Sequence, residues 1–174
     1  MTSILKVSEI QDPTNSNTAL TIDANGVVSS SSQPIFFAYR TVYYNANVAG
    51  GAELTYNAVD VNVGSHYNNL NGRFTAPKTG IYEFGYNSIA SNAATTYRYD
   101  IRLNGSAFSG GAYELRLDQV SSSGEFASNG EYCAYINLTA GDYVSVWVKS
   151  DSGVTNLYND AGYRYMYFRG RFIQ

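Results

Sequence analysis

The sequence predicts an all-β protein, and three observations lead to this prediction. No window of helical length carries apolar residues at i, i+3, i+4 and i+7 without Gly or polar clusters interrupting it. Short runs rich in Val, Ile, Thr, Tyr and Phe alternate instead, bounded by Gly, Asn, Asp and Ser. Aromatic residues make up 15% of the 174 residues, with 17 Tyr and 8 Phe. Many short strands in a chain of this length predict a sandwich, a barrel or a jelly roll.

Nine strands are expected in the larger, C-terminal part of the chain, each ended by residues that tolerate positive φ or hydrogen-bond their own backbone. The expected strands span residues 35–42, 54–63, 72–76, 80–90, 96–103, 112–118, 131–138, 142–150 and 163–173. The turn signals are Asn71-Gly72, Asn104-Gly105, Gly110-Gly111, Asn129-Gly130, Ala140-Gly141-Asp142 and Asp160-Ala161-Gly162. The alternation of Phe74, Tyr82 and Phe84 around one turn is that of a half-buried hairpin.

A run of four serines, residues 29–32, is the one low-complexity linker in the chain. We expect it to divide an extended N-terminal arm, residues 1–33, from a head domain, residues 34–174. In the arm, residues 3–10 predict a short strand or a single helical turn. Residues 19–29 predict a β-hairpin, because an Asn-Gly pair separates two apolar runs there.

The arm is too small to have a core of its own. An isolated ribbon of this size cannot bury enough surface to be stable. It must therefore pair with another chain, pack on the head or dock on a partner, and a disordered arm is the alternative. The apolar residues that would make such a contact are Ile4, Leu5, Val7, Ile10, Leu20 and Ile22.

The composition offers few residues for catalysis, metal binding or nucleic-acid binding. Only 14% of the residues are charged and the net charge is −3, so no basic excess exists to neutralise a nucleic acid. One Cys and one His exclude a disulfide framework and Cys- or His-rich metal sites. The apolar runs fall far short of the roughly 20 residues that cross a bilayer. Residues 1–12 lack the basic start and apolar stretch of a secretory signal. We expect no nucleic-acid partner, no membrane insertion and no secretion signal.

No catalytic residue is predicted. Cys133 and His66 are formally a nucleophile and a base, but a lone Cys in an expected core strand acts as a small buried hydrophobe. His66 is interpreted as an ordinary loop histidine. No pair of carboxylates has a spacing that singles out an acid and a base. The Arg and aromatic residues of 163–172 are also typical of single-strand nucleic-acid surfaces, but their period of two favours a buried strand.

Five blocks of the head occur in the order of a known family. They are IFFAYR at residues 35–40, HYNNLNGRFTAPKTGIYEFGYN at 66–87, LNG at 103–105, LTAGDYVSVW at 138–147 and FRGRFI at 168–173. This order resembles the globular head domain of complement component C1q, in the tumour-necrosis-factor-like jelly-roll superfamily. The resemblance covers residues 34–174. It implies an all-β, ten-stranded jelly-roll sandwich that assembles as a compact homotrimer.

The resemblance also implies which surface would form the trimer. The first and last strands of the head would lie together in the sheet that faces the threefold axis. The last strand alternates Tyr and Phe, so if its Phe side chains fill the core, its Tyr side chains turn toward neighbouring subunits. The first strand contributes alternate residues, which become Phe36 and Ala38 if the register slips by one. The predicted interface consists of Phe37, Tyr39, Tyr163, Tyr165 and Tyr167.

The resemblance makes calcium a candidate ligand, because some members of the family bind it near the top of the trimer. The loops at residues 151–153 and 159–160 offer hard oxygen ligands. No stretch has the spacing of an EF-hand, and Asp and Asn in turns usually cap backbone groups. No metal or cofactor residue is therefore predicted, and calcium stays an alternative.

The arm departs from the family, since no Gly-X-Y collagen stalk precedes the head. It resembles instead the N-terminal segments of structural proteins from tailed bacteriophages of cyanobacterial and marine types, where such segments serve as attachment regions. We therefore expect a non-enzymatic virion structural protein on the phage particle surface. It would be a trimeric decoration, fibre or appendage module that contacts other virion proteins through residues 1–33.

Two other classes of function remain open. The head could be the part of a tail appendage that binds a host glycan or receptor through its Tyr- and Asn-rich loops. The chain could also be a secreted bacterial or animal adhesion protein, although the lack of a signal and a stalk disfavours this. The sequence does not choose between capsid and tail.

Overall fold

The computed structural model describes residues 7–11, 18–29, 33–89, 95–108, 114–119, 130–150, 154–157 and 162–174. All regular elements in these ranges are β-strands. The chain folds as two compact units, Met1–Gln33 and Pro34–Gln174, which we call the arm and the head. Within the described ranges, no helix has the length and apolar character needed to cross a membrane.

The arm is a three-stranded antiparallel sheet in the order β1-β2-β3. Its strands are β1 (Glu9–Gln11), β2 (Thr18–Ile22) and β3 (Val28–Ser29). The β2–β3 turn is held by Asp23, whose Oδ1 accepts hydrogen bonds from the backbone N of Asn25 and of Val27, both at 2.8 Å. Gly26 has a φ of 79°, as this turn requires. The hairpin prediction is confirmed, and residues 9–11 form a strand rather than a helical turn.

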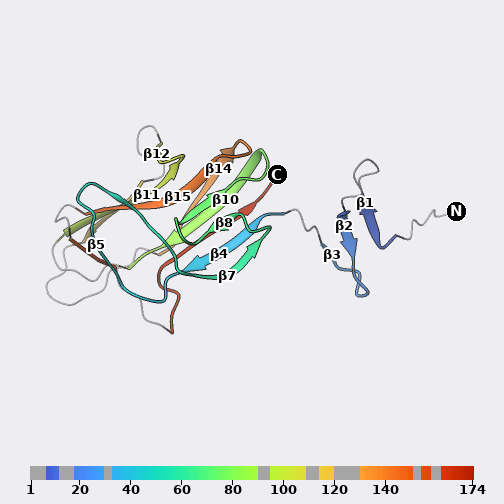
Figure 1. The fold of residues 1–174 in the computed structure, drawn as a ribbon, viewed down its shortest axis with the longest axis horizontal. Helices are drawn as coiled ribbons and strands as arrows, with labels where there is room; N and C mark the ends of the chain where they lie inside the picture. Colours follow the sequence, from blue (N-terminus) through green and yellow to red (C-terminus); the bar gives the residue numbers. More distant parts are fainter. Residues whose placement is uncertain are drawn as a thin grey trace. The chain divides into compact units, whose positions relative to one another are not determined.

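The head contains a five-stranded antiparallel sheet in the order β14-β10-β17-β4-β7 (Figure 1). These strands are β14 (Tyr132–Leu138), β10 (Gly80–Asn87), β17 (Tyr167–Phe172), β4 (Ile35–Tyr39) and β7 (Ala58–Val63). The first and last strands of the head are therefore neighbours, as the resemblance implied. It is called the five-stranded sheet below.

The opposite layer is a seven-stranded sheet built on the path β12-β11-β15-β9-β8, with β13 paired to β11 and β6 paired to β15. Its strands are β6 (Ala52–Glu53), β8 (Tyr67–Asn68), β9 (Arg73–Thr75), β11 (Thr95–Leu103), β12 (Ser106–Ala107), β13 (Glu114–Gln119) and β15 (Tyr143–Ser150). A separate pair joins β5 (Tyr44–Asn47) to β16 (Val154–Leu157). The all-β jelly roll is confirmed, but the expected number of ten strands is not.

Aromatic rings from both sheets fill the space between them. Phe36 lies 4.9 Å from Phe168 and 5.1 Å from Phe74, measured between ring centroids. Gly170 is buried beside them, and a Cβ there would lie 2.6 Å from Phe84 Cδ1 and 2.7 Å from Phe36 Cε1. Only glycine therefore fits at this position, because the rings of two neighbouring strands close over it.

Each of the nine expected strands corresponds to a strand of the head, and the largest differences are at the starts of two strands. The last strand begins at Tyr167 rather than at 163, because the chain bends at the buried Met166 and leaves the ladder before it. The second begins at Ala58 rather than at 54. The short strands β5, β6, β8, β12 and β16 were not expected.

Candidate functional site

The candidate site is the face of the five-stranded sheet that points away from the core, called the outer face below. On β4, Phe36 and Ala38 are buried, so Phe37 and Tyr39 lie on the outer face. On β17, Phe168 and Gly170 are buried, which places Tyr167, Arg169 and Arg171 outward. The alternative register, with Phe36 and Ala38 outward, is therefore wrong.

Three of the five predicted interface residues lie together on the outer face. The rings of Phe37 and Tyr167 are stacked, with centroids 5.3 Å apart and an interplanar angle of 23°. The ring of Tyr39 lies 6.3 Å from that of Phe37. Partial burial raises the pKa of the Tyr167 hydroxyl, so this group stays neutral at physiological pH.

The other two predicted residues, Tyr163 and Tyr165, lie before β17 rather than on it. Their rings stack on each other with centroids 4.9 Å apart. Between them in sequence, Arg164 places its guanidinium 4.6 Å from the ring centroid of Tyr39, and its Nε donates to Asp60 at 2.7 Å. The hydrogen bond from Arg164 holds the pKa of the Asp60 carboxyl below its usual value. Arg164 therefore connects the stacked pair before β17 to the aromatic group on β4 and β17, and the five predicted residues do not lie along one strand.

A network of ion pairs occupies the centre of the outer face. Glu83 on β10 accepts hydrogen bonds from Arg169 Nη1 at 2.7 Å and from Arg171 Nη2 at 2.7 Å. The Glu83 side chain is only 6% exposed. Hydrogen bonds from the two guanidinium groups lower the pKa of this carboxyl, so it is ionised throughout the physiological range. Arg169 Nε also donates to Glu131. Gly85 makes room for this pair, because a Cβ there would overlap Glu131 Oε1.

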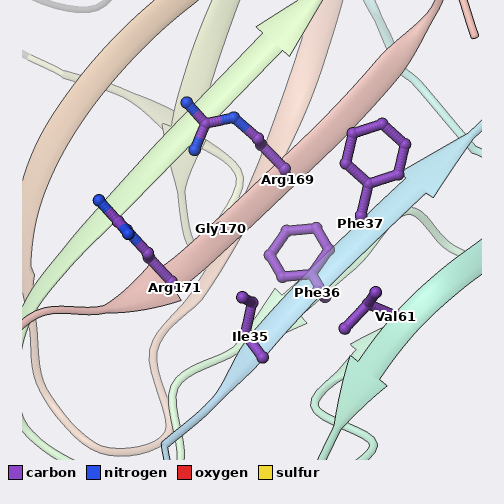
Figure 2. A pocket seen from close by; sticks show the side chains of 7 residues that line it. All are labelled: Ile35, Phe36, Phe37, Val61, Arg169, Gly170 and Arg171. Atoms are coloured by element: carbon purple, nitrogen blue, oxygen red, sulfur yellow. The ribbon is translucent and has the colours of Figure 1, made fainter.

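A hollow of about 110 Å³ opens beside this network. Figure 2 shows its lining: Ile35, Phe36 and Phe37 from β4, Val61 from β7, and Arg169, Gly170 and Arg171 from β17. The two arginine stems rise from β17, and their guanidinium groups are directed away from β4, toward the strand that carries Glu83. The walls of the hollow are therefore mainly apolar, with one charged rim.

Cys133 lies on the outer face, which corrects the prediction that it is buried. On β14 the buried residues are Ala134, Ile136 and Leu138, and Cys133 is exposed. Partial desolvation and the negative charge of Glu83 raise the pKa of the Cys133 thiol. A thiol with a raised pKa is a poor nucleophile at neutral pH. His66 lies just before β8, in the opposite sheet, with its ring against Phe74, so the structure does not bring the two residues together.

Within the described ranges, no group of three or more His, Cys, Asp or Glu side chains is placed to hold a metal ion. The two loops considered for calcium, residues 151–153 and 159–160, lie outside those ranges.

The arm has an apolar face of its own. Ile10 pairs with Leu20 and Ile22 pairs with Val28, and because Leu20 and Ile22 are two residues apart, all four share one face. Ile10 is 47% exposed and Val28 is 57% exposed. Val7 is exposed as well. Of the predicted attachment residues, Ile4 and Leu5 lie outside the described ranges, and Val28 was missed.

Several residues of the outer face were not singled out from the sequence. They are Ile35, Val61, Glu83, Glu131, Tyr135, Arg169 and Arg171. For two of them a signal was present: if Phe168, Gly170 and Phe172 point inward, Arg169 and Arg171 must point outward. Nothing in the sequence indicated that Glu83 would be their partner, because that depends on β10 and β17 being neighbours.

Two antiparallel sheets around an aromatic core, with the first and last strands of the head adjacent, are typical of a jelly-roll domain. The sequence pattern of the C1q domain family matches residues 35–173 of the chain, and the chain belongs to this family. No curated protein matches the chain in sequence.

Solved structures share the fold. The globular domain of the zebrafish complement 1qA protein aligns with a TM-score of 0.59 at 19% identity, over 81% of this chain and 98% of that one. Murine APRIL at pH 5.0 aligns with a TM-score of 0.57 at 11% identity, over 82% and 100%. The Eiger TNF from S. frugiperda aligns with a TM-score of 0.51 at 13% identity, over 82% and 92%.

Proposed function

We propose that this chain is a non-enzymatic virion structural protein of a tailed bacteriophage, whose C1q-type heads form a homotrimer and whose arm attaches the trimer to the particle. The observation that carries the proposal is the outer face, where stacked aromatic rings, an apolar hollow and exposed β7 valines lie on one sheet. The β4 and β7 side of this face would be an exposed apolar patch on a lone subunit, and patches of this kind usually mark interfaces.

The edge of the sheet supports the trimer. β7 is an edge strand, and Val59, Val61 and Val63 on it are each more than a third exposed. An apolar edge strand left uncovered is prone to pair with other chains. Closed threefold assembly covers such an edge without open-ended growth. It is also the assembly that the resemblance to the C1q head implies.

The test of the trimer is light scattering on the purified full-length chain. We expect three times the 19.0 kDa of one chain, with no larger species. Tyr165→Asp should weaken the assembly, because it removes the ring that stacks on Tyr163 and places a carboxylate in a patch that assembly would desolvate. Leu70→Asp is the control, since Leu70 is 87% exposed in the β8–β9 turn of the opposite sheet. A stable wild-type monomer contradicts the proposal.

The arm supports attachment to a partner surface. Ile10 and Val28 on its apolar face are exposed, and the described residues of the arm form a single three-stranded sheet with no second layer. The resemblance of residues 1–29 to phage attachment segments makes another virion protein the proposed partner, and the particle surface the proposed location.

Particles carrying a truncated protein test the attachment. A chain that starts at Gln33 should fold and trimerise but be missing from purified particles, whereas full occupancy after truncation contradicts the proposal. Particles that lack the protein altogether then separate the two uses of the head. Fragile particles with normal adsorption indicate decoration, and intact particles that no longer adsorb indicate recognition of the host.

A further inference from the structure

We infer that Tyr135 of each subunit occupies the hollow at Ile35, Phe37 and Val61 of the next subunit around the threefold ring. The inference rests on the proposed trimer and goes beyond it, because it names the pair of surfaces that set how neighbouring subunits join. Of the residues that form these two surfaces, only Phe37 is among the five interface residues predicted from the sequence.

A closed ring needs two different patches on each subunit. In a head-to-tail interface one patch of a subunit meets a second, complementary patch of its neighbour. The hollow lies at the β4–β7 side of the five-stranded sheet. Tyr135 lies on β14, the strand at the opposite edge, and is 62% exposed. The sheet therefore carries a cavity near one edge and a projecting aromatic side chain at the other.

The two patches lie in line across the sheet. Tyr135 pairs with Glu83, Glu83 with Arg171, Arg171 with Ile35 and Ile35 with Val63. These five residues form one cross-strand row from edge to edge. A rotation about an axis that runs along the strands keeps each row at its own height. Such a rotation brings Tyr135 of one subunit to the level of Ile35 of the next.

The chemistry of the hollow fits a tyrosine. Its volume of about 110 Å³ is smaller than the roughly 150 Å³ of a cavity that accommodates benzene, so it takes part of a ring rather than a whole one. Apolar walls from β4 and β7 favour a ring, which buries a large area at a small cost in conformational entropy. At the rim, Arg171 is 55% exposed, and its hydrogen bonds to Glu83 use its Nε and Nη2 groups. A guanidinium has five N–H donors, so Arg171 retains donors for a tyrosine hydroxyl.

Other exposed tyrosines fit less well. Tyr43 is 57% exposed but precedes β5, which is not part of the five-stranded sheet. Tyr163 is 55% exposed but stacks on Tyr165 and lies before β17, outside the cross-strand row. Among the exposed tyrosines of the described ranges, Tyr135 is the one that shares both the sheet and the row with the hollow.

Charge substitutions at position 135 give a test with an internal control. Within one subunit, position 135 pairs with Glu83, so a carboxylate there is repelled and an arginine is tolerated. In the neighbour's hollow the preference is the opposite, because Arg169 and Arg171 line it. There an arginine is repelled and a carboxylate is tolerated. We therefore expect Tyr135→Arg to raise the subunit dissociation constant by about 30-fold or more, the loss typical of a central interface residue. Tyr135→Glu should raise it less, and Leu70→Arg should leave it unchanged.

Light scattering over a concentration series measures these constants, and circular dichroism shows that each variant is folded. A second measurement does not depend on destabilisation. Benzoylphenylalanine introduced in place of Tyr135 should cross-link on illumination to a peptide containing residue 35, 37 or 61 of another subunit. The inference is overturned if Tyr135→Arg assembles like the wild type, if Tyr135→Glu is the more damaging change, or if the cross-link forms elsewhere. A wild-type monomer would instead overturn the proposed function itself.

Discussion

The arm and the head are both antiparallel β-structure with alternating apolar residues, yet they differ in what covers their apolar faces. In the head, Phe36 and Phe84 on the five-stranded sheet contact Phe74 from the opposite sheet, and all three are at most 1% exposed. In the arm, no second layer packs on Ile10 and the other apolar residues of its face within residues 7–11 and 18–29.

The difference shows that alternation alone specifies a strand but not a stable domain. A β-sheet buries its apolar face only when another sheet or helix packs on it. The head supplies both layers from one chain, so it should fold independently of any partner. The arm supplies one layer, so its order should depend on what it contacts.

The largest effect is expected for Phe168→Ala. Phe168 is fully buried among aromatic rings, and removing its ring from the core should lower the free energy of unfolding by about 3–5 kcal/mol. Leu20→Ala in the arm is the matched control, and it should change the unfolding of the head by less than about 0.5 kcal/mol. Urea denaturation of both variants measures the two values, and equal losses would contradict the independence of the head.

A smaller loss is expected for Gly170→Ala. The added methyl group would collide with Phe84 and Phe36, and overpacking of this kind costs about 1–3 kcal/mol. Gly26→Ala in the arm turn is the control, because no atom lies within 4 Å of a Cβ there, although its φ of 79° is strained for alanine. Denaturation of the head should detect the first change and not the second.

The free energy of unfolding of the head should depend on pH through the ionisation of Glu83. Its pKa is lowered in the folded state by hydrogen bonds from Arg169 and Arg171, so ionised Glu83 stabilises the fold at pH values above its ordinary pKa of about 4.3. That contribution is lost as the pH falls through the folded-state pKa. Glu83→Gln should therefore lower the unfolding free energy at pH 7, and the difference from the wild type should shrink toward pH 3. A difference that does not change with pH would show that the carboxyl contributes through packing alone.

The smallest effect on the head is expected when the arm is removed. A chain starting at Gln33 should melt at the same temperature as the full chain, because the two units are compact by themselves. Differential scanning calorimetry measures this directly. A clearly lower melting temperature would mean that the arm stabilises the head.

The strands were largely predictable because the signals for them are local. The alternation around Phe74 and Phe84 and the Asn25-Gly26 turn each depend on neighbouring residues only. The face of β17 followed once Phe168 and Phe172 were taken to point inward, whereas on β4 the adjacent Phe36 and Phe37 left both registers open. The start of β17 was not predicted correctly, because the chain bends at the buried Met166.

The site was less predictable because it depends on which strands are neighbours. Cys133 was assigned to the core on its residue type, but β14 has a second set of alternate residues, Ala134, Ile136 and Leu138, that is uniformly apolar. Asn137 shares the face of Cys133, and this polar residue was the signal that the face is exposed. The contacts of Glu83 with Arg169 and Arg171 join strands far apart in sequence, so no local pattern could predict them.

The position of β17 in the centre of its sheet has a consequence for how the head folds. β17 is the last described strand in chain order, yet it lies between β10 and β4, so the sheet is in two parts until β17 inserts. Contacts between residues so distant in sequence make folding slow. Before insertion, both β10 and β4 present unpaired edges, and partly folded chains with such edges tend to aggregate. The yield of the soluble protein should thus depend on how quickly β17 inserts between β10 and β4.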